Sequence, residues 1–323
     1  MIERHFSSSS ENDQPARAPG LENRYQGCLI GLAVGDAVGT TVEFRKRGTF
    51  EPLTDMVGGG VFRLVAGQWT DDTSMALCLA TSLIKCNGFD PTDQMAHYCR
   101  WAEEGYLSST GTCFDIGGTT SAALLRFRRS GKPNSGSNEP SSAGNGSIMR
   151  LASIPMFYYP DLETIERYAA ASSITTHGAP ECVDSCRLLS RMIGRALLGQ
   201  SKEDVLFADA GTFVGTEKIA AIARGAYQTK SELDIRGTGY VAESLEAALW
   251  CFLRTDTFKQ AILAAANLGD DADTTAAVCG QLAGAHYGLS SIPSEWRQKL
   301  VMTAEISELA GQLMLRQQPE RTL

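Results

Sequence analysis

The stretch from Tyr25 to Gly35 reads YQGCLIGLAVG. One face of a helix built from it carries the apolar side chains Tyr25, Leu29, Leu32 and Ala33. Another face carries the small residues Gly27, Gly31 and Gly35. Glycines at this spacing let a neighbouring helix approach closely. The stretch therefore predicts a buried helix.

Helical spacing continues through the rest of the chain, and the starts of the periodic segments carry Asp, Thr, Ser or Pro. The predicted helices span residues 73–86, 92–104, 118–129, 147–158, 162–173, 180–198, 202–209, 215–228, 241–253, 256–267, 273–287 and 293–315. Strand signals are scarce, and residues 50–68 predict a Gly-containing loop with a short strand near Val61–Val65. A second loop, residues 130–146, is long enough to favour a functional role or disorder. We expect one all-α domain over residues 23–323.

Residues 1–22 are polar and are predicted to form a disordered arm, either an untethered terminus or a partner-binding extension. They lack the apolar centre of a signal peptide, and no run reaches the roughly 18 apolar residues of a membrane span. The nine cysteines contain no CxxC pair, which is typical of reduced thiols in a cytosolic protein. We therefore expect a cytoplasmic location and no membrane partner.

The net charge of −8 argues against a nucleic-acid partner. Affinity for phosphate backbones comes from neutralisation by Lys and Arg, and an acidic protein lacks the required excess. The hydrophobic fraction of 43% is ordinary for a globular protein, so the chain should bury a substantial core.

Two distant stretches resemble one another: residues 69–76 read WTDDTSMA and residues 269–276 read GDDADTTA. Each places an Asp cluster just before a helix of small apolar residues, where a carboxylate can cap free N–H groups. A cap needs only one Asp, and clustered carboxylates repel each other. Two unrelated acidic helix starts on the surface are the alternative, but the apolar flanks argue against it. The pattern indicates a positive group between the clusters.

Ligand sets made only of oxygen select Mg²⁺, Mn²⁺ or Ca²⁺ over Zn²⁺. Four or five Asp oxygens from two helix starts could bridge two such ions. Thr70 and Thr274 could add hydroxyl or backbone ligands. The sequence thus predicts a centre for hard divalent cations.

Three Gly-rich segments accompany the Asp clusters: residues 31–39, which lead to Glu43, residues 144–150, and residues 236–241. Residues 144–150 precede a predicted helix and offer backbone N–H groups suited to a phosphate. Residues 236–241 add an aromatic side chain. Each of these segments alone is typical of an ordinary turn before a helix. Together they indicate a diphosphate-plus-base ligand.

Seven motifs occur in order over about residues 24 to 290: GDAVG with Glu43, WTDDT, FDIGGTT, GNGSIMR, THG, GTGYV and GDDADTT. In this combination the sequence strongly resembles the ADP-ribosylglycohydrolases, and more closely the bacterial dinitrogenase-reductase-activating glycohydrolases. The resemblance implies a compact orthogonal helical bundle of the ADP-ribosylglycohydrolase type and a binuclear Mg²⁺ or Mn²⁺ centre. It also implies hydrolysis of the N-glycosidic bond between ADP-ribose and a protein side chain, typically arginine.

The resemblance also implies roles for individual residues. The metal ligands would be Thr70, Asp71, Asp72, Asp271, Asp273 and Thr274. Asp115 would lie beside the scissile ribose, and Glu43 would be a mobile-loop carboxylate near the second metal. The substrate contacts would be Asn145, Gly146, Ser147, Met149, His177, Gly239 and Tyr240. The family commonly has Gly at the position of Asp270, so this extra carboxylate either alters metal preference or faces solvent.

Some alternatives stay open at this stage. Asp115 and Glu43 are both candidates for the general acid, and Asp115 could instead be a helix cap. An ordinary loop histidine is as good an interpretation of His177 as a ligand contact. The protein could also act by binding, as an immunity-type factor that blocks an ADP-ribosyltransferase through residues 1–22. A hydrolase of another ADP-ribose conjugate is a third possibility.

Overall fold

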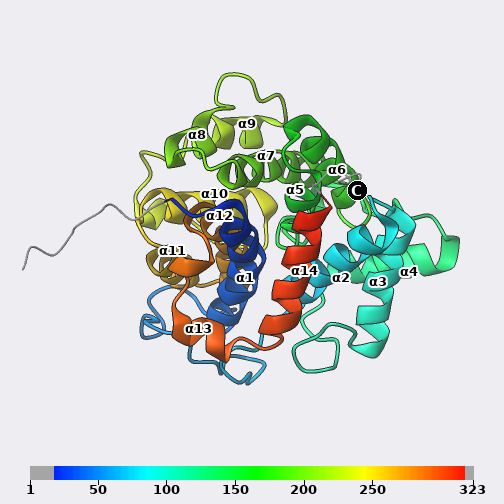
Figure 1. Ribbon diagram of the computed structural model, residues 1–323, viewed down its shortest axis with the longest axis horizontal. Helices are drawn as coiled ribbons and strands as arrows, with labels where there is room; N and C mark the ends of the chain where they lie inside the picture. The colour runs from blue at the N-terminus through cyan, green and yellow to red at the C-terminus, as the bar shows by residue number, and fades with distance from the viewer. Residues whose placement is uncertain (1–17, 317–323) are drawn as a thin grey trace, which may run out of the picture.

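The computed structural model describes residues 18–316, which form fourteen α-helices, three short 3₁₀ helices and no extended strand (Figure 1). The α-helices are α1 (Leu21–Gly39), α2 (Asp71–Cys86), α3 (Pro91–Glu104), α4 (Gly118–Ser130), α5 (Ser153–Tyr158), α6 (Leu162–Ile174), α7 (Pro180–Leu197), α8 (Lys202–Phe207), α9 (Glu217–Ala223), α10 (Val241–Leu253), α11 (Phe258–Ala266), α12 (Ala272–Tyr287), α13 (Ser294–Lys299) and α14 (Thr303–Leu315). The 3₁₀ helices are η1 (Pro140–Ser142), η2 (Glu232–Asp234) and η3 (Leu289–Ser291). The all-α prediction is confirmed.

Helices α1 and α12 pack so closely that their backbones are in contact, and we call this contact the seam. A methyl group built on Gly27 would lie 2.3 Å from the carbonyl oxygen of Gly284, and one on Gly31 would lie 2.4 Å from that of Gly280. The same holds for Gly35, at 2.1 Å from the carbonyl oxygen of Ala276. Only glycine allows this approach, so the predicted small-residue face is the surface on which α12 lies.

The seam is antiparallel and continues to the end of α1. A methyl group on Gly39 would lie 2.3 Å from the carbonyl oxygen of Ala272, the first residue of α12. The C-terminal end of α1 and the N-terminal end of α12 are therefore adjacent. The packing of one helix pair brings residues near 40 and residues near 272 to the same place.

The other helices surround this pair (Figure 1). Helices α10 and α11 pack on α12, and α14 packs on α1. Helices α2, α3 and α4 lie to one side, where Met75, Tyr98, Trp101 and Leu124 belong to a second, smaller apolar cluster. The main core fills the space between α1, α12 and the helices around them.

Three expectations about local structure were wrong. Residues 147–152 form turns, and α5 begins only at Ser153, because Pro155 has no N–H and its ring would clash with a helical carbonyl at residue 151. The segment 293–315 is two helices, since Leu300 is extended and Met302 has a left-handed backbone with φ of 56°. Near Val61–Val65 there is no strand, only a single bridge between Gly59 and Leu64.

Most of the predicted N-terminal arm, residues 1–17, lies outside the described residues, so its proposed contact with an ADP-ribosyltransferase stays a prediction. Helix α1 begins at Leu21, so the last two residues of the predicted arm belong to it. All nine cysteines are unpaired, as expected for reduced thiols. No helix within residues 18–316 combines the length and apolar character that crossing a bilayer requires.

Candidate metal centre and substrate cavity

The two Asp clusters lie at helix starts, and neither is used to cap its own helix. Asp71 and Asp72 open α2, and Asp271 precedes Ala272 at the start of α12. No side chain of Thr70 or Asp271, the residues in the capping positions, bonds to its own helix N-terminus. The carboxylates are therefore left available for another partner.

The early and late clusters meet. The Thr70 hydroxyl lies 3.2 Å from Oδ2 of Asp273, and the Thr274 hydroxyl lies 3.4 Å from Oδ2 of Asp72. Thr70, Asp72 and Asp273 are each at most 1% exposed. About two hundred residues of chain separate groups that touch in the folded protein. The seam between α1 and α12 and the docking of α2 produce this contact.

The docking of α2 depends on Asp36, a fully buried carboxylate of α1. Its Oδ1 accepts hydrogen bonds from the Thr70 N–H at 2.8 Å and the Thr70 hydroxyl at 2.9 Å. Its Oδ2 accepts from the Thr73 N–H at 3.0 Å and the Thr73 hydroxyl at 2.6 Å. Asp36 thus caps α2 from another helix. Sequence reasoning gave it no role, although a lone acid within an apolar helix was the available signal.

Glu43 is brought to the start of α12 by backbone pairing. The Phe44 N–H donates to the Asp270 carbonyl at 2.7 Å, and the Asp270 N–H donates to the Arg45 carbonyl at 2.8 Å. Phe44 and Asp270 both have left-handed backbones, with φ of 60° and 55°. Such conformations persist in non-glycine residues only where the surroundings hold them.

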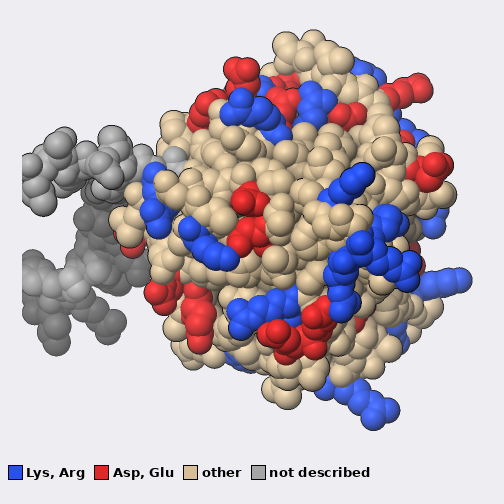
Figure 2. Space-filling model, turned by 90° about the vertical axis from the view of Figure 1, so that its right-hand side faces the viewer, with Lys and Arg blue, Asp and Glu red and all other residues tan. Residues whose placement is uncertain are grey.

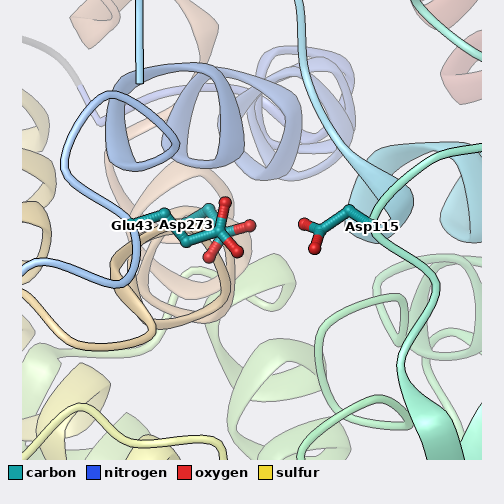
Figure 3. A group of neighbouring side chains, drawn as sticks. All are labelled: Glu43, Asp115 and Asp273. Carbon is teal, nitrogen blue, oxygen red and sulfur yellow. The ribbon is translucent and has the colours of Figure 1, made fainter. Parts of the chain in front are cut away.

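Glu43, Asp115 and Asp273 converge from three parts of the chain. Each offers a carboxylate oxygen, and the three oxygens lie within 4.8 Å of one another. Figure 3 shows Asp115 pointing toward Glu43 and Asp273 from the opposite direction. Asp115 lies in the loop before α4 and also has a left-handed backbone, with φ of 60°. It is not the capping residue of α4, which is Gly117.

Crowding of acids in a buried place raises their pKa values. Burial, followed by the charge of Asp115, raises the pKa of Glu43 to about 9. Burial, followed by the charge of Asp271, raises the pKa of Asp115 to about 7. Burial raises the pKa of Asp72 and Asp273 well above the usual range. These raised pKa values are those of a buried group of carboxylates that has no cation beside it.

The donor set fits a hard divalent cation. Three buried carboxylate oxygens of this site have no hydrogen-bond partner: Oε2 of Glu43, Oδ1 of Asp72 and Oδ1 of Asp273. Buried polar atoms normally have a hydrogen-bond partner. Unpaired oxygens from both clusters therefore indicate that a partner able to accept their electron pairs, such as a cation, is missing. Carboxylate and hydroxyl oxygens are the ligands of Mg²⁺, Mn²⁺ and Ca²⁺.

A cavity of about 400 Å³ opens over these carboxylates. Its lining includes eleven predicted site residues: Glu43, Asp71, Asp115, Asn145, Gly146, Met149, His177, Gly239, Asp271, Asp273 and Thr274. Phe44, Ile116, Thr120 and Gly144 also line it, and sequence reasoning assigned none of them an individual role. The predicted segments therefore enclose one space.

Backbone pairing also joins the Gly-rich segments to the acidic floor of this cavity. The Asp271 N–H donates to the Gly237 carbonyl at 2.8 Å, and the Asn145 N–H donates to the Gly239 carbonyl at 3.1 Å. The Asn145 side chain donates to Oδ2 of Asp271 at 3.0 Å. The segments near 145, 238 and 271 thus form a continuous wall.

His177 contributes a neutral ring to the wall. The Thr176 hydroxyl accepts from the Arg150 guanidinium at 2.8 Å and lies 2.8 Å from Nδ1 of His177. Nε2 of the ring faces Gly146. Burial, followed by the charge of Arg150, lowers the pKa of His177 to about 3. His177 therefore presents a neutral ring with one N–H donor and one acceptor nitrogen.

Four predicted site residues lie outside the lining of the cavity. Thr70 and Asp72 are buried beneath it. Ser147 is buried and accepts a hydrogen bond from the Ser173 hydroxyl at 3.0 Å. The Tyr240 hydroxyl donates to Glu181 at 2.6 Å and accepts from Lys218 at 2.8 Å. Substrate contacts of Ser147 and Tyr240 stay predictions.

Comparison with known proteins gives a consistent result. The sequence profile of the ADP-ribosylglycohydrolase family matches residues 17–322. The chain is 44% identical to the ADP-ribosylarginine hydrolase Tri1 of Serratia proteamaculans, over 94% of this chain and 82% of that protein. It is 32% identical to the ADP-ribosyl-[dinitrogen reductase] glycohydrolase of Rhodospirillum rubrum, over 89% of this chain and 93% of that protein.

A solved structure of an ADP-ribosylglycohydrolase-related protein complex has the same fold. It superposes with a TM-score of 0.81 at 40% sequence identity, and the match covers 92% of this chain and 99% of that one. The matched residues include both Asp clusters and the segments that wall the cavity. The chain therefore belongs to the ADP-ribosylglycohydrolase family.

Proposed function

We propose that this protein hydrolyses the N-glycosidic bond between ADP-ribose and an arginine side chain of a modified protein. Two relatives named ADP-ribosylarginine hydrolase, from Serratia proteamaculans and Pseudomonas putida, are 44% and 46% identical over most of the chain. Hydrolysis of an ADP-ribose bond is also what the family name describes. The arginine linkage is the specific part of the proposal.

One observation carries the proposal: both acidic clusters meet under a cavity, with unpaired carboxylate oxygens between them. The residues that would hold two cations, Mg²⁺ or Mn²⁺, are Thr70, Asp71, Asp72, Asp271, Asp273 and Thr274. When bound, such ions would supply Lewis-acid chemistry that polarises a water molecule and the ribose hydroxyls. The enclosed floor favours this chemistry because a low dielectric strengthens each electrostatic contact.

The other cavity residues would bind and orient the substrate. Asn145 is fixed by its bonds to Gly239 and Asp271, so the adjoining turn can hold the diphosphate and ribose in a set position. His177 offers a ring nitrogen to the same ligand. Glu43 and Asp115 are the candidates to move a proton, since a guanidine leaves easily only when it is protonated.

The first test is release of ADP-ribose from an arginine-modified protein. We expect turnover with Mg²⁺ or Mn²⁺, and loss of turnover with chelator, with Asp71→Ala or with Asp273→Ala. The matched control is Asp161→Ala, which removes a carboxylate at the exposed start of α6, where it caps the N–H groups of Glu163 and Thr164. This control should cost about 1 kcal/mol of stability and keep activity. Turnover that survives in the two site variants contradicts the metal mechanism.

A second test separates the roles of Asp115 and Glu43 and also fixes the linkage. Asp115→Asn and Glu43→Gln should be compared on ADP-ribosyl-arginine, ADP-ribosyl-serine and an ADP-ribose ester. A carboxylate leaves an ester without a proton, so loss of the general acid should matter less there than on arginine. We expect that variant to lose on the order of 10²–10⁴-fold on arginine. Faster turnover of serine or ester by the wild-type protein contradicts the arginine assignment.

A further inference from the structure

Three phenylalanines, Phe44, Phe62 and Phe114, form a continuous set of rings that begins in the cavity lining, and we name this set the aromatic rim. The ring centroids of Phe44 and Phe62 are 6.5 Å apart, and those of Phe62 and Phe114 are 5.2 Å apart. Phe44 also lines the cavity itself. The rim therefore joins the loop after α1 to the loop before α4.

The rim is not explained as part of the core. Phe44 is 65% exposed, and Val61, the chain neighbour of Phe62, is 58% exposed. Phe44 is held outward by a left-handed backbone and by the hydrogen bond from its N–H to Asp270. Bulky residues rarely adopt this conformation, and such strain tends to occur at functional sites. The fold keeps an aromatic ring in water at the entrance of its cavity.

The rim adjoins the reacting end of the cavity. Phe44 follows Glu43 and Phe114 precedes Asp115, the two carboxylates that are candidates to act on the scissile bond. A group joined to the ribose through that bond would lie near the chain neighbours of these carboxylates. The leaving side chain would then be within reach of the aromatic rim.

We propose that the aromatic rim binds the arginine side chain of the target protein and thereby selects the arginine linkage. This inference rests on the proposed function. The aliphatic part of arginine can pack on the rings, and a guanidinium is attracted to aromatic faces. Serine offers neither an aliphatic chain nor a cation.

The test compares two substrates that share the reacting bond. One is an arginine-modified protein, and the other is ADP-ribosylated guanidine, which lacks the aliphatic chain and the polypeptide. The variants are Phe62→Ser and Phe44→Asn, since Asn tolerates the left-handed backbone of Phe44. We expect the ratio of kcat/KM for the protein to kcat/KM for the guanidine to fall about 5- to 30-fold, mainly through KM.

Val65→Ser is the matched control, because Val65 is 70% exposed on the same loop but is not part of the rim; its ratio should not change. Mn²⁺ affinity of each variant checks that the metal centre is intact. With that affinity kept, an equal loss on both substrates, or no loss on either, overturns the role of the rim. A wild-type protein that releases ADP-ribose from neither substrate overturns the proposed function itself.

Discussion

Asp36 shows how one side chain can shape the site through the helix that it caps. All four of its hydrogen bonds go to Thr70 and Thr73, at the start of α2. The position of Asp71 and Asp72 therefore depends on a residue of α1. The sequence did not predict this role, because an acid in an apolar helix can be protonated, paired with another residue or part of a functional site. Which of these applies depends on the residues that contact it in the folded protein.

Asp36→Asn tests this positioning role. The amide keeps the volume, but its NH₂ group must face a donor from Thr70 or Thr73, so at least one charge-assisted bond is lost, worth about 1.5–3 kcal/mol. We expect Mn²⁺ affinity, measured by calorimetry, to fall at least about tenfold, with a parallel loss of kcat. Glu22→Gln, an exposed change on the same helix, should alter neither. Full Mn²⁺ affinity in Asp36→Asn would contradict the role.

His177 makes the folded state sensitive to acid. Its folded pKa of about 3 lies below the unfolded value near 6.5, so between these values only the unfolded chain takes up the proton. This contribution to stability is complete above pH 6.5 and is lost as the pH falls toward 3. Between pH 6 and 4, urea titration should show His177→Asn with a slope lower than wild type by about 1.4 kcal/mol per pH unit. Equal slopes refute the assignment.

At the scale of elements, the seam between α1 and α12 is the contact on which the site depends. Both helices carry small residues every four positions, and their backbones touch from Gly27 to Gly39. Because the seam ends at Ala272, any change in the helix spacing shifts Asp271 and Asp273 as well.

Gly35→Ala should therefore disturb both stability and metal binding. The added methyl group would lie 2.1 Å from the Ala276 carbonyl oxygen, and backbone must move to admit it. We expect a loss of about 1–3 kcal/mol by chemical denaturation, with weaker Mn²⁺ binding. The control is Gly311→Ala in α14, where the nearest atom is 3.9 Å away; it should stabilise by up to about 1 kcal/mol. Similar effects of the two substitutions would show that the seam is not special.

Element type was predictable wherever apolar spacing was regular and ended at a clear signal, as for α10, which was predicted at its observed bounds. The failures have local causes. Pro155 shortens α5, and the break at Met302 interrupts a periodic pattern that has no glycine or proline between residues 294 and 310 to mark it. Periodicity reports which side chains face the core, but not whether the backbone between them is continuous. For the site, spacing identified the acids, while the aromatic rim depends on tertiary contacts.

Over the whole molecule, the distribution of charge differs between the surface and the buried site. On the face shown in Figure 2, Lys and Arg are interspersed with Asp and Glu. The buried site, in contrast, gathers Asp36, Glu43, Asp72 and Asp273 with no Lys or Arg among the residues that line its cavity. This buried negative charge therefore destabilises the protein when no metal is bound.

Stability should therefore depend on divalent cations. At a free concentration of one hundred times Kd, a bound ion adds about 2.7 kcal/mol, which thermal melts detect as a rise in Tm. Asp273→Ala should lose this rise. In chelator, however, the variant should be at least as stable as wild type, because it removes an unpaired buried carboxylate. A variant that is less stable than wild type in chelator would contradict this account.

The backbone contact between α1 and α12 also bears on which ion is accepted. Where two helix backbones are in direct contact, no side chain lies between them that could shift and so change the distance between the helix ends. The distance between the backbones of α1 and α12 is then set by carbonyl-to-Cα packing, not by side-chain rotamers. Such a frame should discriminate by ionic radius, so Mg²⁺ and Mn²⁺, with bonds near 2.1 Å, and Ca²⁺, with bonds of about 2.3–2.6 Å, would not be interchangeable.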